Sequence, residues 1–310
     1  MTSVDVIIPT YKPGREFREL LERLEAQTVR PGHILVINTE EALFDPELIR
    51  DLDNVEVFHI TKEQFDHGGT RNMGAGFSNA GIIVFMTQDA LPADEDLIRH
   101  LTAPFRRDER IKAAYARQCP RDDCSVIEKY TRRFNYPERS MVKTRRDMKQ
   151  LGIKTFFCSN VCAAYDRAYF AEKGGFRQPS IFNEDMIFGG MLIADEQDIA
   201  YAASAVVYHS HNYTAIQQFR RNFDNGVSQA ANPDIFKGVP SAGEGMRLVG
   251  QTARYLRTSK QLYLLPTLVW QSGWKLLGFR LGKLYRHLPR FLVRAFSLNK
   301  DFWNIKVTVD

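Results

Sequence analysis

The chain has 310 residues, of which 44% are hydrophobic and 25% charged, proportions that are typical of globular proteins and exclude a disordered or fibrous chain. The net charge of +5 is uneven: from residue 240 onward, twelve Lys and Arg stand against three Asp and Glu, which gives +9 there and leaves −4 on the first 239 residues. A basic tail on an acidic body indicates a polyanionic partner, either an anionic membrane face or a nucleic acid.

The first half of the chain alternates apolar runs with helix-like stretches. Val4–Pro9 has the apolar run of a buried strand, and in Arg15–Ala26 the apolar residues recur on one helical face. The alternation continues through segments that we predict as a strand at 33–38, a short helix after Pro46, a strand at 55–60, a helix at 70–79 and a strand at 82–86. Strands that alternate with helices predict an α/β fold, with a parallel sheet covered on both faces.

Polar residues follow the predicted strands. In open parallel sheets ligands bind at the carboxyl ends of the strands, so the residues just beyond each strand are the candidate ligand contacts. They are Thr10, Tyr11, Thr39, Asp66, Arg71, Gln88 and Asp89. Asp66 offers a carboxylate that accepts hydrogen bonds, and Arg71 can meet an anion together with a helix N-terminus.

The C-terminal part differs in composition from the first half of the chain, because apolar and aromatic residues are interleaved there with Lys and Arg. We expect residues 1–235 to form the main domain and residues 236–310 a basic, aromatic-rich helical region. Leu262–Phe279 is interrupted by Pro266, Gly273 and Lys275, which favours a helical hairpin at a membrane interface over a spanning helix. A helical cap on the main domain remains an equal alternative, and a contact between copies of the chain is compatible with either.

The four cysteines and the N-terminus point to a reducing compartment. Cys119, Cys124, Cys158 and Cys162 lack the spacing of a zinc knuckle and predict free thiols. The first nine residues lack the basic stretch and apolar run of a signal peptide, so we expect the chain in the cytoplasm.

Five motifs occur in a fixed order between residues 4 and 230: Val6–Tyr11, His67–Asn72, Thr87–Pro92, Asn183–Asp185 and His209–Tyr213. With these motifs the chain resembles an inverting family 2 glycosyltransferase of the GT-A fold, closest to bacterial dTDP-rhamnosyltransferases. The resemblance implies a Rossmann-like, mostly parallel central sheet with helices on both faces and a C-terminal helical extension. It also implies transfer of L-rhamnose from dTDP-β-L-rhamnose to a hydroxyl of a cell-surface glycan. We expect this glycan to be lipid-linked and the enzyme to act on it at the inner face of the membrane.

The resemblance assigns roles to residues of the later motifs. Asp185 corresponds to the general base, and Glu184 orients it or binds the acceptor; for the pair alone a solvated acidic turn is an equal alternative. Asp89 corresponds to a ligand of Mg²⁺ or Mn²⁺, although Thr87 stands where the family usually has a further carboxylate. His209 is the preferred second metal ligand, with His211 left open. Asn160 corresponds to the acceptor side.

Two other functions remain open at this point. The same fold can use a UDP-hexose donor, and a catalytically silent nucleotide- or polyanion-binding protein would also explain the basic tail. The presence of all three of Asp89, Asp185 and His209 favours the enzyme, because a binding protein needs no base. With a glycan as acceptor, we expect no nucleic-acid partner.

Overall fold

The computed structural model describes residues 2–239 and 242–304. These residues form two compact units, which are treated separately below. The first unit comprises residues 1–121, 136–179 and 184–210, and the second comprises residues 122–135, 180–183 and 211–310. The expected boundary after residue 235 stays a prediction about the extent of the catalytic domain; the C-terminal segment of the second unit begins at His211.

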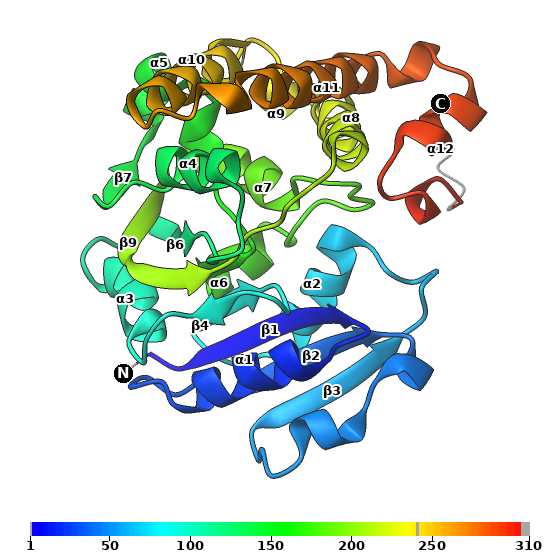
Figure 1. Ribbon diagram of the computed structural model, residues 1–310. Helices are drawn as coiled ribbons and strands as arrows, with labels where there is room; N and C mark the ends of the chain where they lie inside the picture. Colours follow the sequence, from blue (N-terminus) through cyan, green and yellow to red (C-terminus); the bar gives the residue numbers. More distant parts are fainter. Residues whose placement is uncertain (1, 240–241, 305–310) are drawn as a thin grey trace. The chain divides into compact units, whose positions relative to one another are not determined.

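The first unit is built on a mixed sheet that contains nine strands within the described residues (Figure 1). The strands are β1 (Val4–Tyr11), β2 (Ile34–Thr39), β3 (Val55–Ile60), β4 (Ile82–Met86), β5 (Leu91–Pro92), β6 (Ile111–Cys119), β7 (Met141–Lys143), β8 (Cys162–Asp166) and β9 (Asp198–Tyr208). Their order is β3-β2-β1-β4-β8-β6-β9-β5, with β7 paired to β9. The β3-β2-β1-β4 half is parallel, whereas β8 runs antiparallel to both β4 and β6.

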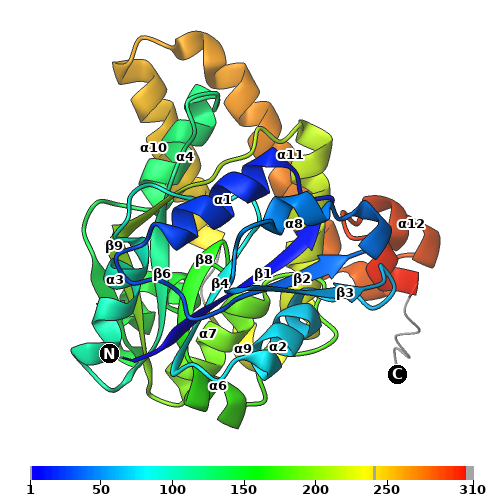
Figure 2. The ribbon, with the colours of Figure 1, turned by 90° about the horizontal axis from the view of Figure 1, so that it is seen from below.

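Helices cover both faces of this sheet. Leu20, Leu21 and Leu24 of α1 (Arg15–Glu25) join the β1 side chains Val6 and Ile8 in one core. The helix α3 (Leu97–Thr102) packs into the same core. The other face carries α2 (His67–Phe77), α6 (Arg167–Glu172) and α7 (Glu184–Ala194). Figure 2 shows α1 and α2 on opposite sides of β1. The expected α/β architecture with two covered faces is therefore confirmed.

An aromatic cluster fills the second face. The rings of Phe85, Tyr165, Phe170 and Phe176 lie with centroids 4.9–5.7 Å apart. On the same side, a Cβ on Gly74 of α2 would lie 2.4 Å from Cγ2 of Ile7. Only glycine therefore lets α2 approach β1 this closely. The contact fixes the start of α2 near the carboxyl ends of the strands.

The starts of two helices place residues of the site. The helix α2 begins at His67 rather than Thr70, because the Asp66 carboxylate accepts hydrogen bonds from the backbone N–H groups of Gly68 and Gly69. The helix α7 begins at Glu184, so Glu184 and Asp185 lie in its first turn. Short 3₁₀ segments complete the unit at 41–43, 46–49, 103–106, 145–147 and 152–156, with α5 at Met148–Leu151. The four cysteines are free thiols.

The second unit is helical throughout its described part. It contains α4 (Val126–Asn135), α8 (Ala215–Ala231), α9 (Pro233–Phe236), α10 (Ala242–Thr258), α11 (Leu265–Lys283) and α12 (Arg290–Phe296), with 3₁₀ turns at 262–264, 285–287 and 301–304. Leu256 of α10 and Leu268 of α11 pack with Ile127 of α4, and the rings of Tyr130 and Tyr255 stack 4.6 Å apart. Pro266 is tolerated because it lies in the first turn of α11.

The helices α8 and α11 pack closely through glycines. A Cβ on Gly278 would lie 2.2 Å from the carbonyl oxygen of Phe219, and one on Gly282 would lie 2.1 Å from that of Phe223. These are distances that real Cβ atoms do not reach, so the two backbones touch where side chains are absent. Within the described residues, none of the helices is both long and apolar enough to cross a membrane.

Candidate active site

Residues after three neighbouring parallel strands meet at one edge of the sheet in the first unit. Tyr11, at the end of β1, pairs in register with Thr39 of β2. The Gln88 side chain, just beyond β4, accepts a hydrogen bond from the Tyr11 backbone N–H at 2.8 Å and donates one to the Tyr11 carbonyl at 3.2 Å. Thr10 donates to Oδ1 of Asn38 at 3.0 Å. The Tyr11 side chain is 42% exposed at this edge, which leaves its ring accessible to a ligand.

Asp66 and Arg71 lie at the start of α2 and are both engaged within the protein. Oδ1 of Asp66 caps the helix, as described above. The Arg71 guanidinium is buried, and its Nη1 donates to the His67 carbonyl and lies 3.3 Å from Oε1 of Glu184. Arg71 therefore holds Glu184, a contact that the sequence analysis did not anticipate.

Asp89 follows β4 directly, and His209 follows β9. Nε2 of His209 lies 3.5 Å from Oδ2 of Asp89. His209 is buried, and its backbone N–H bonds to the Cys119 carbonyl. One carboxylate oxygen and one imidazole nitrogen at this distance form a donor set that suits Mn²⁺ or Mg²⁺ when phosphate oxygens complete the shell. The residues present thus fit a divalent cation. His211, the other candidate ligand, is assigned to the second unit and begins its C-terminal segment.

Asp185 and Glu184 are held by the residues that precede β8. The Asn160 backbone N–H donates to Oδ2 of Asp185 at 3.0 Å, and the Met186 N–H donates to Oδ1 at 2.7 Å. The Asn160 side chain donates to Oε1 of Glu184 at 3.0 Å and accepts from the Tyr165 hydroxyl at 2.9 Å. Both carboxyl groups are therefore fixed in position by short hydrogen bonds.

The pKa values of the two acids are shifted in opposite directions. Burial, followed by the neighbouring Glu184 carboxylate, raises the pKa of Asp185 to about 7. Burial alone would also raise the pKa of Glu184, but the charges of Arg71 and His67 and the Asn160 amide bring it below its ordinary value. Glu184 is thus the permanently ionised partner, while Asp185 can take up and release a proton near neutrality.

Sequence reasoning missed three further residues at this edge: Gln118 and Ser159, which connect its His209 and Asp185 ends, and Arg121, which contacts Asp89. Nδ1 of His209 lies 3.3 Å from Oε1 of Gln118, whose Nε2 donates to Ser159 at 2.8 Å, next to Asn160 in the chain. Arg121 donates to the Asp89 carbonyl at 2.6 Å and pairs with Glu16. Gln118 and Arg121 lie at and after the end of β6, so recognition of that strand would have drawn attention to them.

Comparison with known proteins identifies the family. The family model described as glycosyl transferase family 2 matches residues 5–173. The O-antigen chain rhamnosyltransferase RfbN of Salmonella typhimurium is 39% identical over 303 residues, which is 97% of this chain and 96% of that protein. The O-antigen chain rhamnosyltransferase WbaN of Salmonella anatum is 36% identical over 307 residues, 98% of this chain and 96% of that protein.

Solved structures share the fold at low sequence identity. The mannosyltransferase PcManGT from Pyrobaculum calidifontis, in complex with GDP-Man and Mn²⁺, superposes with a TM-score of 0.56 at 14% identity over 98% of this chain and 85% of that one. The S. aureus TarS fragment 1–349 in complex with UDP-GlcNAc gives a TM-score of 0.53 at 14% identity, covering 92% of both chains. The sequence matches, which span nearly the whole chain, show that this protein is an enzyme and belongs to glycosyl transferase family 2.

Proposed function

We propose that this enzyme transfers L-rhamnose from dTDP-β-L-rhamnose to a hydroxyl of a cell-surface glycan, with inversion at the anomeric carbon. The names of two relatives that match nearly the whole chain, both O-antigen chain rhamnosyltransferases, support rhamnose as the sugar and an O-antigen glycan as the acceptor class. A lipid-linked acceptor at the inner membrane face fits an enzyme whose C-terminal region is basic and rich in exposed aromatic residues.

The observation that carries the proposal is the Asp185 carboxyl, which is half-buried, accepts hydrogen bonds from two backbone N–H groups and has its pKa raised to about 7. In an inverting transfer the acceptor oxygen bonds to the anomeric carbon as the bond from that carbon to the diphosphate oxygen breaks. The proton of the acceptor hydroxyl passes to the Asp185 carboxylate. The backbone N–H groups of Asn160 and Met186 hold that carboxylate in place, and dTDP leaves.

Asp89 and His209 would hold Mg²⁺ or Mn²⁺ in this scheme. Bound there with the donor, the cation supplies charge neutralisation for the departing diphosphate. The Mn²⁺ in the PcManGT structure supports a cation in this fold. Gln118 and the Cys119 carbonyl orient His209, so that Nε2 faces Asp89.

Donor recognition is assigned to the edge formed by Thr10, Tyr11, Thr39 and Gln88. The exposed Tyr11 ring offers a stacking surface for the nucleobase. Oδ1 of Asp66 is used by the helix cap, so a contact to the thymine imide is assigned to Oδ2. The buried contact between Arg71 and Glu184 favours a positioning role for Arg71 over direct contact with phosphate.

The test is Asp185→Asn, assayed with dTDP-β-L-rhamnose and an O-antigen precursor. We expect turnover to fall by about 10²–10⁴-fold, the usual contribution of a general base, with donor affinity retained. Asp195→Asn, just beyond the end of the same helix and paired with Lys173 at the surface, is the matched control. Unchanged turnover in Asp185→Asn would remove Asp185 from the mechanism.

A UDP-hexose donor is the alternative on the same fold, and the TarS complex with UDP-GlcNAc supplies the precedent. A thermal-shift screen of nucleotide sugars with Mn²⁺ separates the two, because a ligand of the folded state raises the melting temperature. Stabilisation by dTDP-rhamnose but not by UDP-hexoses supports the proposal, and the reverse result overturns the donor assignment.

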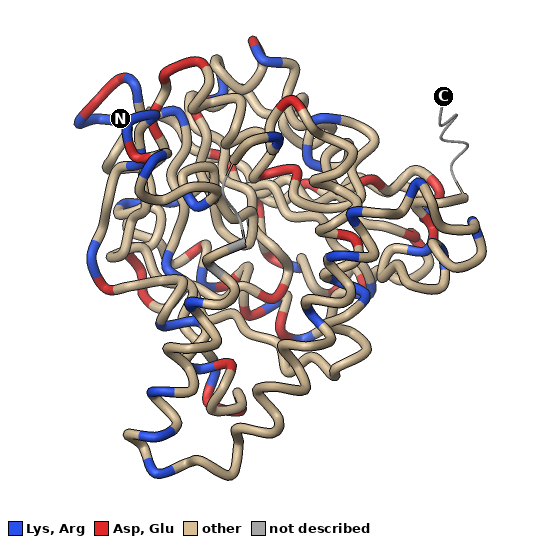
Figure 3. Tube along the Cα trace, turned by 90° about the horizontal axis from the view of Figure 1, so that it is seen from above, with Lys and Arg blue, Asp and Glu red and all other residues tan. Residues whose placement is uncertain are grey.

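The membrane contact is assigned to the hairpin of α10 and α11. Exposed apolar side chains gather there, among them Leu262, Tyr263, Val269, Trp270, Leu276 and Leu277. Lys and Arg lie before and after the apolar stretch 261–274, on α10 and on the C-terminal half of α11 (Figure 3). Aromatic rings beside basic residues suit the interface of an anionic bilayer.

Co-sedimentation with vesicles containing phosphatidylglycerol tests this contact. Trp270→Ser should reduce binding, whereas Ile216→Ser, an equally exposed apolar side chain on α8, should not. Equal binding by both variants would contradict the membrane contact. Self-association through the same surface would instead appear in light scattering as an apparent molecular mass that rises with protein concentration. Trp270→Ser should abolish that rise.

A further inference from the structure

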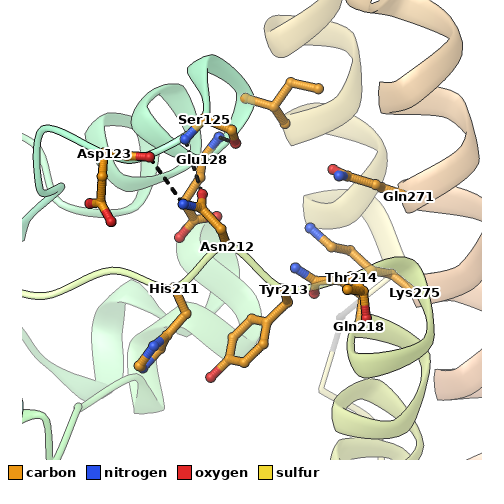
Figure 4. A pocket seen from close by; sticks show the side chains of 11 residues that line it. Asp123, Ser125, Glu128, His211, Asn212, Tyr213, Thr214, Gln218, Gln271 and Lys275 are labelled. Atoms are coloured by element: carbon orange, nitrogen blue, oxygen red, sulfur yellow. Dashed lines mark hydrogen bonds between the residues drawn. The ribbon is translucent and has the colours of Figure 1, made fainter.

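A second pocket lies within the second unit alone, apart from the residues assigned above to catalysis and donor binding. It has a volume of about 320 Å³, at the lower end of the about 300–1,000 Å³ found for ligand pockets, and therefore has room for one small ring. The lining comes from the α4 segment, the linker before α8, and the helices α8 and α11 (Figure 4). The lining residues are Asp123, Ser125, Ile127, Glu128, His211, Asn212, Tyr213, Thr214, Gln218, Gln271 and Lys275.

The walls of the pocket are held in place by contacts within the unit. The Asn212 side chain accepts a hydrogen bond from the Ser125 N–H and donates one to the Asp123 carbonyl, both at 3.0 Å, which joins the linker to the start of α4 (Figure 4). Thr214 caps α8 in a reciprocal pair with Gln217. The Arg221 guanidinium lies 5.6 Å from the centre of the Tyr213 ring and supports it. The site is therefore formed before any ligand arrives.

Two polar side chains of α11 point into this space. Gln271 and Lys275 lie one turn apart and project toward the α4 segment (Figure 4). Within the stretches 2–239 and 242–304, the Lys275 ammonium has no hydrogen-bond or ion-pair partner, and its burial lowers its pKa. Burying a cation without a partner costs free energy, which a ligand with hydrogen-bond acceptors would recover.

The chemical groups that line the pocket indicate which class of ligand it binds. Carboxylates on Asp123 and Glu128 oppose a phosphate or other dianion, and Ile127 is the only aliphatic side chain in the lining. Amides, hydroxyls, carboxylates and an ammonium around one cavity match a ligand whose groups both donate and accept, and sugar hydroxyls do both. The Tyr213 ring adds a flat apolar surface for the C–H face of a sugar.

We propose that this pocket binds a sugar residue of the acceptor glycan, with Lys275 and Gln271 contacting its hydroxyls and Tyr213 its apolar face. The inference rests on the proposed function, since it supposes a glycan acceptor. It adds an acceptor-binding site that is lined by residues of the second unit, among them His211, the other candidate metal ligand.

The first experiment measures binding to the full chain by saturation-transfer NMR, with a panel of methyl glycosides of hexoses and 6-deoxyhexoses as probes. At least one glycoside should give a signal, and Lys275→Met and Gln271→Ala should each weaken its affinity by about tenfold. Lys283→Met, an exposed lysine on the same helix outside the pocket, is the matched control and should retain wild-type affinity. Thermal melts verify that each variant is folded.

The second experiment separates this inference from the proposed function. Hydrolysis of dTDP-β-L-rhamnose by water, without any acceptor, reports the donor site alone, and both pocket variants should leave it unchanged while raising the KM for the bound glycoside as acceptor. If the donor is not turned over at all, the proposed function fails, and the NMR result still decides the pocket. The inference is overturned if no glycoside binds the wild type, if both variants bind as tightly as the wild type, or if inorganic phosphate displaces the glycoside.

Discussion

The backbone amide of Asn160 donates a hydrogen bond to Oδ2 of Asp185 over 3.0 Å, at the point where the chain enters β8. Because β8 pairs with β4, the same connection places Asp185 beside the end of the strand that leads to Asp89. The Thr87 N–H bonds to the Val161 carbonyl at 3.2 Å and closes this junction. The antiparallel strand therefore links the proposed base to the proposed metal ligands.

The pH dependence of transfer should follow Asp185. A base must be ionised to accept a proton, so kcat/KM should fall about tenfold per unit of pH below its pKa and level off above about pH 7. Glu184→Gln removes the adjacent negative charge, which lowers the pKa of Asp185 and should move the acidic limb to lower pH. A pH profile of the wild type and of this variant measures the shift; an unmoved limb would mean that another group controls the rate.

The effects of substituting Arg71 and Glu184 on the free energy of unfolding should depend on each other. Both side chains are 7% exposed, so Arg71→Met leaves a buried carboxylate without its cation, at a cost of about 3–5 kcal/mol. The double variant Arg71→Met, Glu184→Gln removes both charges and should recover much of that loss. Urea denaturation of the two variants provides the measurement, and a double variant no more stable than the single one would disprove the coupling.

Asp66 has two assigned roles that substitution can separate. Asp66→Ala should lose about 1 kcal/mol through the helix cap, whereas Asp66→Ser keeps a capping oxygen and should retain stability. If Asp66 also contacts the nucleobase, Asp66→Ser should still raise the donor KM. Wild-type stability together with a wild-type donor KM in Asp66→Ser would leave the cap as its sole role.

The packing of α8 against α11 should tolerate no side chain at Gly278. Its Cβ would meet the Phe219 carbonyl oxygen at 2.2 Å, so Gly278→Ala should destabilise the protein by about 1–3 kcal/mol. Gly273→Ala on the same helix is the control: its Cβ meets nothing within 4 Å, and alanine there should stabilise by about 0.5–1 kcal/mol. Thermal melts of both variants distinguish the effects of crowding from those of helix propensity, and equal changes would refute the close packing.

The proposed cation should couple to donor binding. Calorimetric titration of dTDP with and without Mn²⁺ should show tighter binding with the metal. His209→Gln should abolish that gain, because it removes the imidazole that faces Asp89. A metal-dependent gain that survives this substitution would place the cation elsewhere.

The sequence by itself determined the first four strands and the polar edge beyond them. The strands at 55–60 and 82–86 occur where predicted, because a short apolar run is a local signal that burial in a sheet requires. The residues beyond those strands were identifiable for the same reason, since parallel strands end at one edge. The start of α2 was misplaced by three residues, because Asp66 had been read as a ligand contact rather than a cap.

Only the tertiary structure decided which of these residues touch. Arg71 meets Glu184 and Asn160 meets Asp185 because the antiparallel β8 lies between β4 and β6, an insertion that the alternation of strands and helices did not predict. The pocket of the second unit likewise combines the α4 segment with helices much later in the chain. Apolar periodicity indicates whether a segment is buried. Which residues distant in the chain come into contact depends on sheet order, register and the closure of loops, and no local sequence pattern predicts these.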